Sequence, residues 1–271
     1  MSEAVLIRDG PLAHLRWGDG GERVVLLLHG VGGGREVWGD AISGTGSALA
    51  QAGYTAIAPD LPGYGDSASI EPYTMAGLAA RVTALIDTLR ARRCALVGHS
   101  MGGMLALEVM ANSANHVQAL VLSAASPAFG RPDGAWQAEF LAQRLGPLDA
   151  GAGMASLAPG LALGMASPTA PHDAVARAAI VMSAVPQATY RSALRAIVGF
   201  DRRALLGELR LPVLCLAGEH DRNVPPALVQ HLAARVAGAE FHCMPAVGHL
   251  ANMEAPALFN AALIDFLERR F

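Results

Sequence analysis

The stretch Gly98-His99-Ser100-Met101-Gly102 decides how this chain is interpreted. It lies between the apolar run Cys94-Ala95-Leu96-Val97, which is typical of a buried strand, and a helical segment over about 103–113. A strand that turns sharply into a helix through G-x-S-x-G presents the serine hydroxyl at the edge of a sheet. Ser100 is therefore a candidate nucleophile. A glycine-rich turn with an incidental serine is the alternative interpretation of these five residues.

The composition is that of a globular protein that can bury a large core. The chain has 271 residues, of which 52% are hydrophobic and 16% charged, and its formal net charge is −3. Because the arginines are scattered and form no basic stripe, we expect no nucleic-acid partner. The sequence contains no run of 18 apolar residues and no signal-peptide core, so we expect no membrane span and a cytoplasmic protein.

All 20 basic residues are arginines, and this restricts the possible chemistry. Without lysine there is no Schiff-base amine, no P-loop lysine and no Ser-Lys dyad, which leaves histidine as the expected base for an activated serine. The three cysteines, Cys94, Cys215 and Cys243, lie in short apolar runs and are predicted to be buried. Neither they nor the scattered His and Asp residues have metal-ligand spacing, so no metal is expected.

The glycine-rich stretch over 30–34 resembles a dinucleotide-binding loop only superficially. Its third required glycine is replaced by Arg35, and no acidic residue closes the next expected strand in a suitable place. We therefore expect no cofactor.

Apolar runs alternate with helical segments along most of the chain. A hairpin is expected over 5–17, and buried strands are expected over 24–28, 54–58, 94–97, 119–122 and 213–216. Between about 127 and 209 the alternation stops and only helices and loops are expected. This pattern predicts an α/β core over residues 1–126 and 210–271 with a mostly parallel sheet. It also predicts a helical cap over 127–209, lying above the carboxyl ends of the strands, where such sheets bind ligands.

A base and an acid follow two later strands. His249 comes just after the last expected strand, over 240–244, and Asp221 follows the strand over 213–216. The order Ser, Asp, His along the chain is that of α/β-hydrolases. Glu219 would lie on the same face of an extended segment as Asp221, so the spacing alone leaves both carboxylates open as the orienting acid.

Five motifs in this order resemble those of the α/β-hydrolase fold superfamily over nearly the whole chain. Besides the serine turn they are His29-Gly30-Val31-Gly32, Asp60-Leu61-Pro62-Gly63-Tyr64-Gly65-Asp66-Ser67, Gly218-Glu219-His220-Asp221 and Gly248-His249. The chain is most similar in appearance to 3-oxoadipate enol-lactonase and carboxylesterase-like members. The resemblance implies an eight-stranded, mostly parallel sheet flanked by helices, with a helical cap, and it favours Asp221 over Glu219.

The same resemblance implies a serine hydrolase that cleaves a small carboxylic ester or lactone through an acyl-enzyme. Ser100 would attack the carbonyl carbon, His249 would accept its proton and later activate water, and Asp221 would orient the imidazole. The backbone N–H groups of Met101 and Val31 would bind the oxyanion.

The sequence indicates the substrate-binding residues less specifically than the catalytic ones. Trp136 in the cap could line a pocket or only anchor the cap. Arg191 and Arg195 are four residues apart on one helix face and could bind a substrate carboxylate, or could form a solvated face. His29 and Leu250 flank expected strand ends. The apolar stretch over 154–166 could form the pocket roof, so we expect an apolar or aromatic ester or lactone as substrate.

Two other functions are compatible with the same motifs. Carbon–carbon bond hydrolases of this fold commonly have Asn before the nucleophile and Trp after the catalytic histidine, whereas this chain has His99 and Leu250. Perhydrolysis and a receptor-like binding module on the same fold remain alternatives. The sequence does not indicate an oligomeric state.

Overall fold

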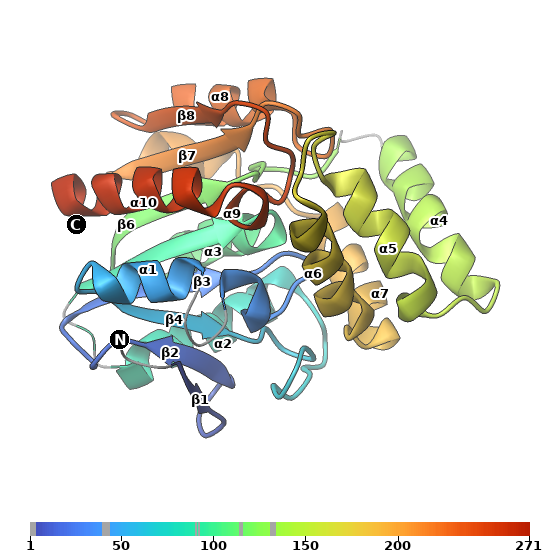
Figure 1. The fold of residues 1–271 in the computed structure, drawn as a ribbon, viewed down its shortest axis with the longest axis horizontal. Coiled ribbons are helices and arrows are strands. Elements are labelled where there is room, and N and C mark those ends of the chain that lie inside the picture. Colours follow the sequence, from blue (N-terminus) through green and yellow to red (C-terminus); the bar gives the residue numbers. More distant parts are fainter. Residues whose placement is uncertain (1–3, 40–43, 90, 92, 114–115, 131–133) are drawn as a thin grey trace.

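An eight-stranded sheet forms the centre of the molecule, with strand order β1-β2-β4-β3-β5-β6-β7-β8 (Figure 1). The computed structural model describes all residues except 1–3, 40–43, 90, 92, 114–115 and 131–133. The antiparallel hairpin of β1 (Val5–Ile7) and β2 (His14–Trp17) lies at one end of the sheet. The parallel strands are β3 (Arg23–Leu28), β4 (Thr55–Pro59), β5 (Arg93–His99), β6 (Val117–Ser123), β7 (Val213–Gly218) and β8 (Glu240–Met244). This confirms the expected α/β-hydrolase architecture.

The apolar runs in the central strands are explained by burial on both faces of the sheet. In β3, Val24, Leu26 and Leu28 pack into one core cluster, whereas Val25 and Leu27 pack into the cluster on the other face. Outside the expected cap segment, the helices that pack into the first cluster are α2 (Met75–Leu89), α3 (Met101–Ser113) and α8 (Pro226–Ala234). Those of the second are α1 (Thr45–Gln51) and α10 (Pro256–Arg270).

The segment expected to form the cap is helical. It contains α4 (Ala135–Asp149), α5 (Met154–Met165), α6 (His172–Ser183), α7 (Gln187–Val198) and the 3₁₀ helix η3 (Ala204–Glu208). Figure 1 shows α4 to α7 gathered beyond the carboxyl ends of the parallel strands. Among the described residues of this segment the only β pairing is an isolated bridge between Ala128 and Asp201. Across the described chain, no helix is long and apolar enough to cross a membrane.

One local expectation is wrong. Cys94 and Cys215 are buried as predicted, but Cys243 is exposed because β8 is an edge strand with only one neighbour. At the C-terminal end of the chain, the short helix α9 (Ala251–Glu254) is separated from α10. The break falls at the residue before Pro256, where the proline ring disfavours helical backbone.

Candidate active site

The turn between β5 and α3 holds Ser100 in a strained conformation. Its φ is 54°, in the left-handed region that side chains other than glycine rarely adopt. The Ser100 N–H donates a hydrogen bond of 2.9 Å to the Ser123 carbonyl at the end of β6, which holds the turn against its neighbouring strand. Strain of this kind persists only where the surrounding structure enforces it, and it is concentrated at functional sites.

The glycines of the motif are required by close backbone approach. A Cβ on Gly98 would lie 2.3 Å from the Gly102 carbonyl oxygen, and one on Gly102 would lie 2.1 Å from the Leu28 carbonyl oxygen. Both distances are far shorter than a carbon–oxygen contact allows. The start of α3 is therefore pressed against the ends of β5 and β3, which supports the interpretation of the motif as a strand–turn–helix elbow.

His249 and Asp221 form a buried pair. His249 Nδ1 lies 2.7 Å from Asp221 Oδ2, and the two side chains are 5% and 0% exposed. The other carboxylate oxygen, Oδ1, accepts the N–H groups of Asn223 at 2.8 Å and Val224 at 2.9 Å. A carboxylate at Nδ1 favours the tautomer protonated there and leaves Nε2 as the basic nitrogen.

Glu219, the other candidate for the orienting acid, lies away from His249. The Glu219 carboxylate is exposed and accepts the Ala246 N–H at 2.8 Å. Of the two carboxylates that the spacing left open, it is Asp221 that contacts the imidazole.

Ser100 and His249 border the same two cavities. Within the described chain no hydrogen bond joins the Ser100 hydroxyl to the His249 ring. In ligand-free enzymes such contacts are often long and shorten when substrate binds.

Two backbone N–H groups are available beside Ser100. The loop after β3 passes so close that a Cβ on Gly30 would lie 3.3 Å from the Ser100 Cβ. Among the residues that the structure describes, neither the Val31 N–H nor the Met101 N–H has an acceptor. The Met101 N–H opens α3, where the helix dipole favours negative charge. The Tyr64 hydroxyl donates a hydrogen bond of 2.8 Å to the Val31 carbonyl and fixes the loop from behind.

His29 supports this loop from the interior and borders neither cavity. It is fully buried, its Nδ1 lies 2.9 Å from the Gly30 carbonyl oxygen, and its Nε2 accepts the Leu61 N–H at 3.1 Å. Desolvation lowers its pKa, which keeps the ring neutral. The structure therefore does not bring His29 to the substrate-binding region for which it was a candidate.

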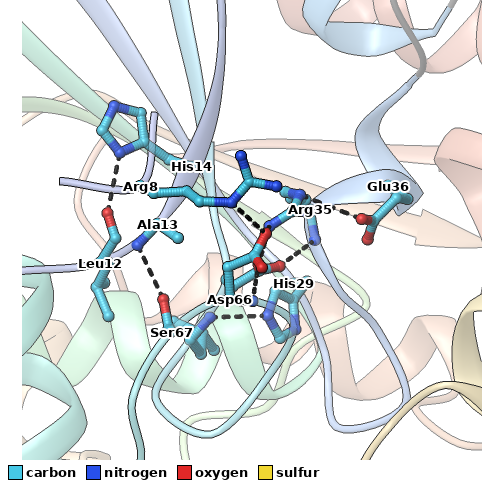
Figure 2. A network of polar contacts seen from close by, with 11 residues as sticks. Arg8, Leu12, Ala13, His14, His29, Arg35, Glu36, Asp66 and Ser67 are labelled. Atoms are coloured by element: carbon cyan, nitrogen blue, oxygen red, sulfur yellow. Dashed lines mark hydrogen bonds and ion pairs between the residues drawn. The ribbon is translucent and has the colours of Figure 1, made fainter. Parts of the chain in front are cut away.

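A charged network lies behind the same loop (Figure 2). The fully buried Asp60 carboxylate accepts the Arg35 backbone N–H at 3.1 Å, the Asp66 N–H at 3.0 Å and a short contact from the Arg35 guanidinium. Arg35 also pairs with Asp66 at 2.8 Å, and Asp66 with Arg8 at 3.5 Å. The hydrogen bond from Arg35 lowers the pKa of Asp66. No pattern in the sequence indicated this role of Arg35.

The smaller of the two cavities has a volume of about 80 Å³. Apart from Ser100, His249, His99 and Asn252, its described lining consists of glycines and apolar side chains that include Val37, Ala178 and Leu250. The predicted contact of Leu250 with a substrate is therefore possible on this side. Because one water needs about 15 Å³ by this measure, the cavity admits only a few heavy atoms.

The larger cavity, of about 280 Å³, extends under the cap. Its lining is mainly aromatic and aliphatic, and the aromatic side chains are those of Phe129, Trp136, Phe140 and Tyr190. Trp136 packs against Phe129 with a centroid separation of 5.1 Å, yet it is 50% exposed and lies at the rim. Of the apolar stretch over 154–166, Leu161 and Met165 reach this cavity, whereas Leu163 is 68% exposed.

The two arginines predicted to bind a carboxylate are not at either cavity. Helix α7 turns Tyr190, Leu194 and Ile197 toward the larger cavity. Arg191 instead pairs with Asp149 at 2.5 Å, and Arg195 is exposed. The spacing placed both arginines on one face correctly, but it could not tell which face of α7 meets the cavity. Two other arginines, Arg144 and Arg222, border it.

Comparisons with known proteins identify the family of this chain. The model of the alpha/beta hydrolase family matches residues 25–262. A protein of Variovorax paradoxus assigned as carbamate hydrolase RutD is 32% identical over 267 residues, covering 96% of this chain and 97% of the relative. A pimeloyl-[acyl-carrier protein] methyl ester esterase of Neisseria meningitidis is 27% identical, with 90% of this chain and 92% of the relative covered.

A solved structure extends the agreement to three dimensions. The enol-lactonase from Burkholderia xenovorans LB400 matches with a TM-score of 0.81 over 97% of this chain and 100% of that chain. At 24% identity this match shows the fold alone. Since the family model spans β3 to α10, with the serine turn between them, the chain belongs to the alpha/beta hydrolase family.

Proposed function

We propose that this protein is a serine hydrolase that cleaves small carboxylic esters or lactones through an acyl-enzyme intermediate. The observation that carries the proposal is the meeting of three features at the same cavities. These are the strained Ser100 on its elbow, the buried His249–Asp221 pair at 2.7 Å, and the unpaired N–H groups of Val31 and Met101. The ester-hydrolysing relative from Neisseria meningitidis supports the same reaction class.

In the first half of the reaction, the Ser100 oxygen attacks the substrate carbonyl carbon while its proton passes to His249 Nε2. The oxygen of the tetrahedral intermediate accepts hydrogen bonds from the Val31 and Met101 N–H groups. Asp221 stabilises the imidazolium through Nδ1. When the intermediate collapses, the bond to the leaving oxygen breaks and His249 returns the proton to that oxygen, which leaves as an alcohol.

In the second half, His249 removes a proton from water, and the hydroxide attacks the acyl carbon. A second tetrahedral intermediate uses the same two N–H donors. Its collapse breaks the bond to Ser100, the serine recovers its proton from His249, and the carboxylic acid departs.

The lining of the cavities supports an apolar or aromatic substrate. The small cavity suits a group of a few atoms, and the larger one suits an extended apolar or aromatic arm. Trp136 and Leu250, candidates from the sequence, would contact opposite ends of such a substrate.

Covalent labelling of Ser100 tests the proposal. We expect a fluorophosphonate probe to add one adduct to the wild type at Ser100, located by mass spectrometry, and none to Ser100→Ala. Turnover of p-nitrophenyl esters should fall about 10⁴-fold or more in Ser100→Ala, Asp221→Asn and His249→Gln. Ser156→Ala, at an exposed serine of the cap, is the matched control. Folded protein without a label at Ser100, or ester turnover retained by Ser100→Ala, would overturn the proposal.

A further inference from the structure

Two arginines at the larger cavity have no acidic partner within the described chain. Arg35, Arg191, Arg202, Arg203 and Arg269 all form ion pairs with carboxylates. Arg144 and Arg222 form none there, although both border the larger cavity.

The charged side chains that border this cavity are arginines. Its described lining includes no Asp or Glu, and its polar groups besides the two arginines are Ser100, His249, Asn223 and Tyr190. The described lining of the smaller cavity includes no Asp, Glu or Arg. A substrate that spans both cavities would therefore meet positive charge in the larger cavity and no arginine in the smaller one.

The side chain of Arg144 is restricted by its surroundings. Its guanidinium carbon lies 5.6 Å from the centroid of the Phe140 ring, in the range of a cation–π contact, and the residue is half-buried. A restricted arginine loses less freedom when it binds an anion. Arg222 is exposed, but the backbone that carries it is fixed, because Asp221 Oδ1 accepts the N–H groups of Asn223 and Val224.

We propose that Arg144 and Arg222 bind a carboxylate at the end of the larger arm of the substrate. Guanidinium groups match carboxylate oxygens in two-pronged hydrogen bonds, and the apolar lining of the cavity would contact the chain between this carboxylate and the scissile ester. The proposal rests on the proposed function and specifies its substrate as an ester or lactone that carries a free carboxylate. Because Arg144 comes from the cap and Arg222 from the core, a bound carboxylate would bridge the two.

A selectivity measurement tests this inference. The substrates are monomethyl esters of α,ω-dicarboxylic acids with five to nine carbons, each compared with the methyl ester of the monocarboxylic acid of equal length. We expect the wild type to prefer the charged member by about tenfold or more in kcat/KM at one or more lengths, as a charged hydrogen bond implies. This preference should weaken at high salt, which screens the charges.

Variants assign the preference to the two arginines. Arg222→Gln, at an exposed position, and Arg144→Gln should each reduce the ratio of kcat/KM for the charged ester to that for the neutral ester several-fold. The double variant should bring this ratio close to one, while hydrolysis of the neutral esters is retained. Arg195→Gln, on an exposed face of α7 away from both cavities, is the matched control and should keep the wild-type ratio.

The possible failures can be told apart. Hydrolysis of neutral esters with no preference for the charged member at any length would overturn the carboxylate site and leave the proposed function standing. A preference that survives in the double variant would also overturn it. Loss of ester hydrolysis altogether, together with no labelling of Ser100, would be the failure of the proposed function itself.

Discussion

At the scale of single residues, the site depends on side chains whose conformation or protonation differs from that of an average residue. Ser100 has a left-handed backbone, and His99 beside it is almost fully buried with a ring centroid 4.8 Å from that of His249. Such features cost stability and are retained where function needs them.

The backbone strain at Ser100 predicts opposite effects on stability and activity. Ser100→Ala and Ser100→Gly both remove the nucleophile and should be inactive. Only glycine adopts a φ of 54° without a steric penalty, so Ser100→Gly should be more stable than Ser100→Ala by about 1 kcal/mol. Urea unfolding of the two variants measures this difference. Equal stabilities would show that the elbow stores no strain.

Buried neutral histidines predict a loss of stability in acid. Desolvation, followed by the nearby His249 and His29, lowers the pKa of His99 well below its usual value of 6.5. As the pH falls through 6.5 the unfolded chain takes up a proton at this position and the folded chain does not, so the free energy of unfolding decreases.

Between pH 7.5 and 5.5 one such histidine contributes about 1.4 kcal/mol to this decrease. His99→Gln should reduce the acid loss by about this amount, as measured by urea unfolding at the two pH values. His231→Gln, at an exposed histidine of α8, should leave it unchanged. An unchanged loss in His99→Gln would mean that His99 is protonated in the folded protein.

At the scale of elements, one carboxylate joins the cap to the loop that carries His249. Glu254, at the end of α9, is buried and accepts the N–H groups of Gly248 at 2.9 Å, Leu250 at 3.0 Å and Ser167 at 2.9 Å. The His249 N–H donates to the Met165 carbonyl at 2.8 Å, so the end of α5 and the histidine loop are bound side by side.

Glu254→Gln tests this connection. The amide replaces one accepting oxygen with an NH₂ group, leaving at least one buried N–H without an acceptor, so we expect a loss of about 2 kcal/mol in unfolding free energy. Because the lost bond holds the histidine loop, kcat should fall about tenfold while KM changes little. Glu219→Gln, at an exposed carboxylate with one backbone bond, is the matched control. A stability loss with wild-type kcat would restrict Glu254 to a structural role.

At the scale of the whole molecule, the sequence predicts the core site well and the cap poorly. Parallel strands bring their carboxyl ends to one edge, so residues that follow β5, β7 and β8 meet whatever their separation along the chain. The cap lacks such a rule, because the face of α7 that meets the cavity depends on how four helices pack. Arg144, a cap residue at the larger cavity, was missed for this reason, and Glu254 because one of its partners is Ser167 in the distant cap.

The network around Arg35 shows how distant segments become interdependent. Arg35 follows the glycine-rich loop after β3, and Asp60 follows β4. Arg8, which pairs with Asp66, belongs to the N-terminal hairpin region. The Arg35 side chain is 12% exposed and that of Asp60 is 0% exposed. Removing one member of a buried pair leaves an uncompensated charge, so Arg35→Met should lower the unfolding free energy by about 3–5 kcal/mol.

Arg191→Met supplies the comparison at the surface. Its partner Asp149 is 65% exposed, and exposed ion pairs contribute only about 0–1 kcal/mol. Because Arg35 also anchors the loop that carries Val31, Arg35→Met should lower kcat as well, whereas Arg191→Met should leave it unchanged. Unfolding curves and ester turnover of the two variants decide the matter. Similar small losses of unfolding free energy and of kcat in the two variants would mean that water screens the Arg35 ion pairs. The loop that carries Val31 would then keep its position without Arg35.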